Sequence, residues 1–188
     1  GTGSVTVSAE APTVVDAQAV TKFIVGLMAL GGLDAESRTE DSLKASVEKA
    51  DIILSGDLTV SGSATTTSTA NTQMGGFIGG GNDSKSIAES YIGYDLIING
   101  NLVGYGPQTV YAGISGGSVT ADGNVTVSAV NTGEAEANVE AGTVLSGISI
   151  EKTSMPTRSL YSTTASVKDG TVITAGKDIK IGTTDNQT

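Results

Sequence analysis

The chain has 188 residues, and it contains no cysteine, no histidine and no tryptophan. Without cysteine it can form neither a disulfide nor a zinc–thiolate site. Without histidine and cysteine it cannot contain a Ser–His–Asp or Cys–His catalytic arrangement. We therefore expect a chain that is not an enzyme and that carries no cofactor and no metal ion.

Positive charge is scarce as well, because ten Lys and Arg stand against twenty Asp and Glu, which gives a formal net charge of −10. Binding to nucleic-acid phosphates or to an anionic membrane surface requires clustered cations. The longest apolar run, residues 23–30, is interrupted by Gly26 and is far shorter than the roughly twenty residues of a membrane-spanning helix. We expect neither nucleic acid as a partner nor a membrane span.

Aromatic residues make up 4% of the chain, whereas glycine is abundant, with 26 residues. Few aromatics suit a narrow core of small and β-branched side chains. Short runs of alternating or β-branched residues recur throughout and predict strands, so we expect an all-β fold. These runs lie at residues 5–7, 52–54, 58–60, 96–98, 125–127, 148–150, 172–173 and 179–181.

An internal repeat relates the first and last parts of the chain. The sequence SVTVSA at residues 4–9 recurs as NVTVSA at residues 124–129, an offset of 120. The similarity extends, with one extra residue, from residues 4–58 to residues 124–179. Self-similarity in register over more than fifty residues predicts a repeat architecture in which successive units stack on one another.

A shorter copy relates DIILSGDL at residues 51–58 to DLIINGNL at residues 95–102, an offset of 44 that marks a middle unit at about 57–102. An offset of 44 is the length of two solenoid turns of about 22 residues. With a rise of about 4.8 Å between strands, the chain would form a β-solenoid of about eight turns, roughly 40 Å tall, with loop or short helical excursions. We treat residues 1–188 as a single segment cut from a longer repeat protein.

Residues 14–50 allow two interpretations. Val20, Ile24 and Leu27 have helical spacing, so an inserted helical hairpin is one possibility. The repeat favours strands, because the offset of 120 aligns Ile24 and its neighbours with residues 144–150, which are β-branched and interrupted by glycine.

The sequence TASVKDGTVITAGKDIKI at residues 164–181, like GNVTVSA at residues 123–129, resembles the haemagglutinin-type repeats of large secreted exoproteins. The longer unit, with its Ala-rich and Gly-rich middle at residues 135–150, is similar to repeats of fusobacterial leukotoxin-like exoproteins. The resemblance implies a right-handed parallel β-helix. It also implies a passenger segment of a two-partner-secreted or autotransported protein that uses an outer-membrane secretion partner. The motif includes no catalytic residue.

This resemblance implies a function in adhesion or virulence. Our first hypothesis is a structural or adhesive segment of a secreted or cell-surface bacterial exoprotein, which would bind a host cell-surface protein or glycan, or neighbouring exoprotein chains. The alternative is a repeat segment of a leukotoxin-like cytotoxin that binds the target cell. A polysaccharide-active β-helix enzyme is the weakest hypothesis.

The apolar run at residues 23–30 is the candidate contact surface. If its side chains project outward they form an exposed apolar patch, and if they line the column they are core, which is the commoner outcome. The candidate residues are Phe23, Ile24, Leu27, Met28 and Leu30.

Other polar groups have simpler explanations. Stacked Asp57, Asn101, Asn124 and Asp178 could form a calcium ladder, but we expect turn residues that bond to the backbone. Acids at residues 34–41 and 134–140 are expected to form a solvated face, and residues 79–90, with three consecutive glycines, a flexible excursion. The five tyrosines are expected to pack at the flank of the column; they are Tyr91, Tyr94, Tyr105, Tyr111 and Tyr161.

Overall fold

The computed structural model describes residues 3–21, 23–98, 101–140 and 142–187. Within these ranges the side chains of residues 24, 29, 94–105, 146 and 149 are not described. All regular structure in the described residues is β, in fourteen strands. The described residues within 14–50 are therefore strands and short connections, as the repeat indicated, and the described part of the chain includes no helical excursion.

Three parallel sheets build the molecule. Sheet A contains β1 (Val5–Val20), β4 (Leu58–Gln73), β9 (Val125–Glu140) and β14 (Ile179–Gln187). Sheet B contains β2 (Ile24–Thr39), β5 (Phe77–Ile92), β10 (Val144–Ser154) and β11 (Thr157–Ser159). Sheet C contains β3 (Ser42–Leu54), β8 (Gln108–Ala121), β12 (Tyr161–Lys168) and β13 (Val172–Ala175).

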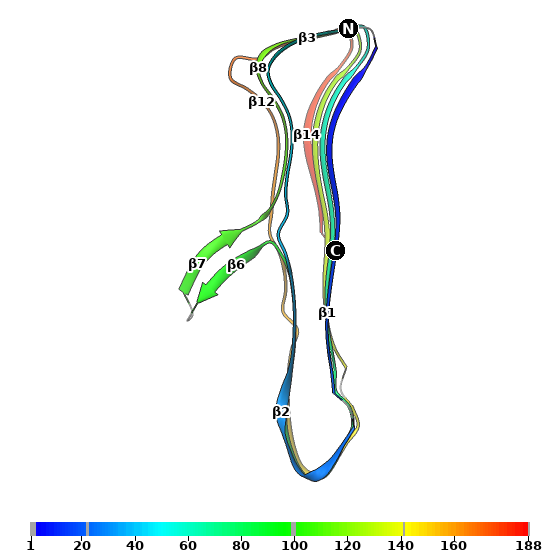
Figure 1. Ribbon diagram of the computed structural model, residues 1–188, viewed down its shortest axis with the longest axis vertical. Helices are drawn as coiled ribbons and strands as arrows, with labels where there is room; N and C mark the ends of the chain where they lie inside the picture. The colour runs from blue at the N-terminus through cyan, green and yellow to red at the C-terminus, as the bar shows by residue number, and fades with distance from the viewer. Residues whose placement is uncertain (1–2, 22, 99–100, 141, 188) are drawn as a thin grey trace.

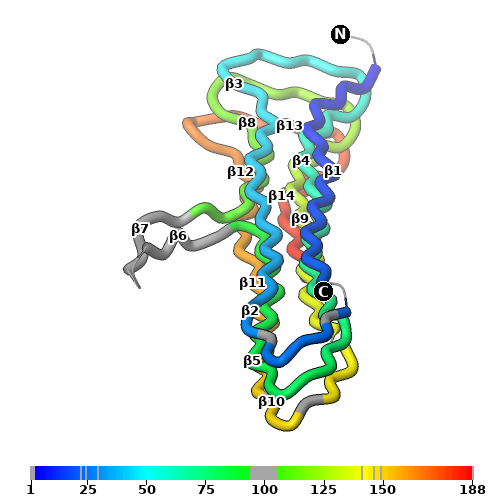
Figure 2. Tube along the Cα trace, turned by 60° about the horizontal axis from the view of Figure 1, so that its bottom comes forward, coloured from blue at the N-terminus to red at the C-terminus, as the bar shows by residue number. Residues whose placement is uncertain are grey.

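The chain passes through sheets A, B and C in that order three times and then enters sheet A again (Figures 1 and 2). In sheet A, Val5 pairs with Leu58, Leu58 with Val125, and Val125 with Ile179. The three circuits therefore contain 53, 67 and 54 residues. Figure 1 looks along the stack, so that the strands of each sheet lie behind one another.

The expected turn of about 22 residues, and with it the count of about eight turns, is wrong. One circuit contains two strands of 16 residues, such as β4 and β5, where a typical strand has about five or six. The described chain therefore makes three wide circuits, and at about 4.8 Å per layer the stack is only roughly 15 Å deep.

The extra residues of the second circuit form an antiparallel hairpin of β6 (Tyr94–Ile98) and β7 (Asn101–Gly106), which projects from the side of the molecule between sheets B and C (Figure 1). The described residues of the sequence copy, 95–98 and 101–102, lie in this hairpin and do not stack on residues 51–58, so the offset of 44 matches no pairing between circuits in the described residues. The offset of 120 is the sum of the first two circuits, 53 and 67.

The interior between sheets A and C is a hydrophobic core. Leu58 and Val60 of β4 pack with Ile114 of β8, and all three side chains are fully buried. The cluster also includes Ala45, Val47, Leu54, Ala64, Val110, Ala112, Val119, Ala121, Val125, Val127 and Ala129.

In the interior between sheets A and B most buried side chains are small, namely alanine, serine and threonine, with Phe77 and Ile92 near its two ends. Ala35, Ala70 and Ala88 form its small apolar cluster. The Oγ atoms of Ser37 and Ser68 lie 2.9 Å apart, and Ser90 donates to Ser68 Oγ at 2.9 Å and to the Ser68 carbonyl at 2.5 Å. Short polar side chains thus bond to one another across this part of the interior.

Gln108 lies where the two parts of the interior meet, and its side chain is fully buried. It accepts a hydrogen bond from Thr66 Oγ1 at 2.9 Å and donates to Asn131 Oδ1 at 2.6 Å. Because both partners are also buried, this amide satisfies polar groups that would otherwise be costly in the interior.

Candidate contact surface

Large apolar side chains gather on the outer face of sheet B, near its junction with sheet A. Strands β2, β5 and β10 pair in register, so that paired residues of the three strands form rows across the sheet; the pairing skips Leu27, Gly80 and Gly147. Val25, Ile78 and Leu145 form one such row. We define the outer apolar patch as Val25, Leu27, Met28, Leu30, Ile78, Leu145, Ile148 and Ile150, all of them exposed.

The paired rows of the patch face sideways, so further circuits added at either end of the stack would not cover their outer side. Ile78 shows this most clearly, since β5 is bonded on both sides and Ile78 is nevertheless 42% exposed. Leu27 is the most exposed, at 92%. Residues paired in a parallel sheet point to the same side, so Val25 and Leu145 project outward with Ile78.

The inner side of the same strand has the opposite character. Asn82, Ser84 and Ser86 of β5 are buried, and Asn82 Nδ2 donates to Ser84 Oγ at 3.2 Å. The usual alternation of a strand places apolar side chains inward and polar ones outward. In this part of sheet B the alternation is inverted: Asn82, Ser84 and Ser86 lie inside, whereas Ile78 and its row neighbours Val25 and Leu145 lie outside. At its two ends β5 keeps the usual polarity, with Phe77 and Ile92 buried.

Three glycines leave the middle of the patch without side chains. Residues 79–81 of β5, all glycine, lie between the apolar side chains of β2 and those of β10. A Cβ added at Gly81 would meet no atom within 4 Å, so its side is open. The expectation of a flexible excursion at residues 79–90 is wrong, because they belong to the central strand of sheet B.

Charged groups adjoin the patch on the same outer face. Asp83 lies between Leu30 and Ile150 in its row, and Lys85 lies beside Lys152 in the next outward row. Both Asp83 and Lys85 are exposed. One acid and one cation therefore stand two residues apart at the edge of the apolar surface.

Farther along sheet B, Tyr91 lies in a row of cations. The guanidinium of Arg38 is 5.0 Å from the centre of the Tyr91 ring, and Arg158 pairs with Tyr91 on the other side. Burial, with Glu89 nearby, raises the pKa of the Tyr91 hydroxyl. Tyr111 of sheet C lies in the same way between Lys44 and Lys168, at 5.9 and 5.8 Å. Tyr91 and Tyr111 pack on the outside of the wall, as expected, and the side chains of Tyr94 and Tyr105 lie outside the described residues. The expectation is wrong for Tyr161, which shares a row with the buried Gln108 and has a buried hydroxyl.

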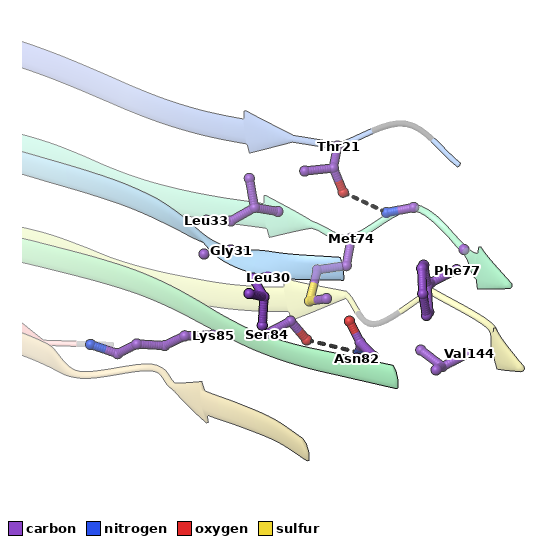
Figure 3. Close-up of a pocket in the computed structure, with 13 residues that line it drawn as sticks. Thr21, Leu30, Gly31, Leu33, Met74, Phe77, Asn82, Ser84, Lys85 and Val144 are labelled. Atoms are coloured by element: carbon purple, nitrogen blue, oxygen red, sulfur yellow. Dashed lines mark hydrogen bonds between the residues drawn. The ribbon is translucent and has the colours of Figure 1, made fainter. Parts of the chain in front are cut away.

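A cavity of about 200 Å³ lies at the turn from sheet A to sheet B (Figure 3). Its lining is mainly apolar, and Figure 3 shows Met74, Phe77 and Val144 around it, with the bonded pair of Asn82 and Ser84 at one side. The glycine at residue 76 leaves room for Phe23, since an added Cβ would come within 2.5 Å of the Phe23 ring. The cavity can hold a small apolar group.

The stacked turn residues bond to the backbone of the neighbouring circuit. Asp57 Oδ1 accepts from the backbone N–H of Asn124 at 2.6 Å, and Asn124 Oδ1 accepts from that of Asp178 at 3.2 Å. Ser4 begins this series by accepting from the Asp57 N–H at 2.9 Å. These oxygens fix the corner between sheets C and A, and the structure assigns them a backbone role. The side chain of Asn101 lies outside the described residues.

The acids lie on separate outer faces. Glu36 of sheet B contacts Arg38, whereas Glu136 and Glu140 of sheet A accept hydrogen bonds from Asn138 at 2.8 Å and Gln73 at 2.8 Å. Within the described residues, no group of three or more acidic residues is placed to hold a metal ion.

Of the candidate contact residues, Met28 and Leu30 lie in paired rows of the outer face, and Leu27, which the pairing skips, is exposed next to them. The commoner expectation, that this run is core, is wrong for these exposed side chains. Phe23 is exposed beside the cavity, and the side chain of Ile24 lies outside the described residues. Sequence reasoning did not assign Ile78, Leu145, Ile148 or Ile150 to the surface, although the repeat had aligned three of them with Val25, Met28 and Leu30.

Comparison of the chain with family models, curated proteins and solved structures finds no match. In the part of the chain that the structure describes, no helix has the length and apolar character needed to cross a bilayer.

Proposed function

We propose that the chain is a segment of a right-handed parallel β-helix. Its support is the cyclic order of the sheets, the parallel pairing between circuits and the nearly constant circuit length outside the hairpin. Parallel strands joined by a crossover in one sheet are right-handed in about 98% of cases, which favours that hand here. The resemblance to haemagglutinin-type repeats agrees with this proposal.

We propose that this segment has a structural and adhesive role in a large secreted or surface-exposed bacterial exoprotein. We assign it no catalytic role. Its contact surface would be the outer apolar patch, and its partners a host cell-surface protein or glycan, or neighbouring exoprotein chains. A rigid wall of long paired strands would hold this surface in a fixed shape.

The observation that best supports this proposal is the inverted polarity in sheet B, where polar side chains lie inside and large apolar ones outside. Full burial of a large apolar side chain contributes roughly 1.5–3 kcal/mol, so eight exposed ones forgo on the order of ten kcal/mol. That amount is comparable with the whole stability of a domain. Side chains that stay on the outside forgo this burial energy in folding, whereas a contact surface recovers it when its partner binds.

The test is the double variant Leu27→Ser with Met28→Ser, and its matched control is Val14→Ser. Val14 is 76% exposed on the outer face of sheet A, away from the patch. We expect both variants to melt like the parent chain, because these side chains face water. In flow cytometry with labelled chain on leukocytes, the double variant should bind at least about tenfold more weakly. Unchanged binding of the double variant would contradict the assigned surface, and a folded parent chain that binds no cells would contradict adhesion to cells.

A further inference from the structure

We propose that the cavity at the turn from sheet A to sheet B binds a small neutral molecule that has an apolar body and a hydrogen-bond-accepting oxygen. This site goes beyond the proposed contact surface, because its polar lining lies on the inner side of sheet B and its ligand is a small molecule. The apolar lining comes from all three circuits and consists of Leu30, Leu33, Met74, Phe77 and Val144.

The volume of the cavity selects a small ligand. It measures about 200 Å³, and an engineered apolar cavity of about 150 Å³ is large enough to hold benzene. One aromatic ring with a short substituent therefore fits, whereas an oligosaccharide or a long acyl chain exceeds the space. A mainly apolar lining with a few polar groups is the usual character of a small-molecule site.

A glycine on β2 leaves part of this space open. Gly31 pairs with the buried Ser84, so a side chain at residue 31 would point inward beside that of Ser84. A Cβ added at Gly31 would meet no atom within 4 Å, and the φ angle of Gly31 is not positive. Farther along the same inner side, Ala35 packs in a closed cluster with Ala70 and Ala88. The interior is therefore filled at the alanines and open at Gly31.

A buried pair of polar side chains gives the cavity one hydrogen-bonding end. Asn82 and Ser84 are 6% and 9% exposed, and Asn82 Nδ2 donates to Ser84 Oγ at 3.2 Å. Figure 3 shows this pair at one side of the cavity. Because Ser84 Oγ accepts from the amide, its own hydrogen can be donated to a ligand atom. The pair therefore selects a carbonyl, ether or hydroxyl oxygen on the ligand.

Two further hydroxyls on the inner sides of β4 and β5 are buried without a hydrogen-bond partner among the described residues. They are Thr72 Oγ1 and Ser86 Oγ, and Ser86 is the next inward residue after Ser84. The hydrogen bond between Ser68 and Ser90 fixes which positions of the two strands face each other, and it places Thr72 opposite Ser86. Unsatisfied buried hydroxyls are costly. A ligand oxygen suits this part of the interior better than a pure hydrocarbon does.

The charges at the cavity favour a neutral ligand. Of the lining residues that the structure describes, Lys85 alone carries a charged side chain. Lys85 is exposed, and Figure 3 shows its side chain directed away from the other lining side chains. A charged ligand would lose its hydration and would find no opposite charge inside the cavity.

The test is a titration of the isotope-labelled full chain with acetophenone, followed by the chemical shifts of the backbone amides. Acetophenone is an aromatic ketone, and α-methylstyrene has the same shape with a CH₂ group in place of the ketone oxygen. We expect acetophenone to bind with a Kd of about 1 mM or lower and to shift the amides of Gly75 and Ser84, which line the cavity. The hydrocarbon should bind about fivefold more weakly, because it lacks one hydrogen bond.

Two variants locate the site. Gly31→Leu places a side chain in the cavity and should weaken acetophenone binding at least about tenfold. Its matched control is Gly182→Leu, which also has open space but lies on a strand of sheet A and should bind like the parent chain. Ser84→Ala should make the two probes bind equally, because it removes the hydroxyl that distinguishes them. Every variant should keep the far-UV circular dichroism of the parent chain.

Three results would overturn the proposal. The first is a folded parent chain with no saturable shifts up to about 10 mM acetophenone, and the second is unchanged binding in a folded Gly31→Leu. The third is equal binding of the two probes by the parent chain, which would refute the ligand class. If Gly31→Leu does not fold, the shifted amides and the comparison of the probes in Ser84→Ala still decide. Cell binding by the parent chain does not depend on this site, so the proposed adhesive function is tested separately.

Discussion

The two halves of the interior differ in what holds them together. Between sheets A and C, side chains such as Leu58, Val60 and Ile114 form a hydrophobic core. Between sheets A and B, Ser37, Ser68 and Ser90 bond to one another among alanines. One continuous strand, β4, lines both halves, so the same backbone ladder supports two kinds of packing. The second half has few large apolar side chains inside, and several of those in sheet B lie on its outer face instead.

The largest effect is expected from truncation in the hydrophobic half. Ile114→Ala removes three carbons from a fully buried site and should lower the free energy of unfolding by about 3 kcal/mol. Denaturant titration followed by circular dichroism measures this loss. A loss below about 1 kcal/mol would show that this half is not the main source of stability.

A smaller effect is expected in the serine half. Ser68→Ala removes the hydroxyl that joins Ser37 and Ser90, but these two also bond to backbone carbonyls, so the loss should be about 1 kcal/mol. The control is Thr65→Ala, an exposed position on the same strand, with a change within about 0.5 kcal/mol. If Ser68→Ala cost as much as Ile114→Ala, the proposed difference between the halves would be refuted.

The smallest effect concerns Tyr161, which pairs in register with Gln108 at the junction of the halves. Burial raises the pKa of its hydroxyl above the usual 10.0, so the folded state favours the protonated form. The contribution of Tyr161 to the free energy of unfolding is complete below the pKa that its hydroxyl has in the unfolded chain. This contribution is lost as pH rises through the higher pKa of the folded chain. We expect the unfolding midpoint to fall above about pH 10, and to fall less in Tyr161→Phe. Identical pH profiles would exclude Tyr161 as the titrating group.

The sequence allowed prediction of strands and of the equivalence at an offset of 120, but not of the circuit length. The strand motif VTVS at residue 5 does recur as LTVS at residue 58, one circuit later. The hairpin changes the next spacing to 67, so no single period was visible. A copy of residues 51–58 in the hairpin segment suggested a shorter turn, although its described residues pair within the hairpin and not between circuits.

The contact surface was predictable only in part. The run that includes Leu27 and Met28 stood out as apolar, but an apolar run in a strand is usually core. Its direction depends on which side of sheet B faces sheet A, and that is a property of the assembled circuit. No local pattern indicates that Ser84 and Ser86 are inside, because serine is mostly exposed in proteins.

The hairpin of the second circuit leaves the wall unchanged. Gly93 N donates to the Thr39 carbonyl at 2.7 Å and Gln108 N to the Leu160 carbonyl at 3.0 Å, so both of its ends are fixed to neighbouring circuits. The second circuit exceeds the first by 14 residues, 67 against 53, and pairing resumes in register after them. This corner is therefore a place where the gene can gain or lose codons without shifting any strand. It is also the natural position at which to graft a foreign epitope onto the scaffold.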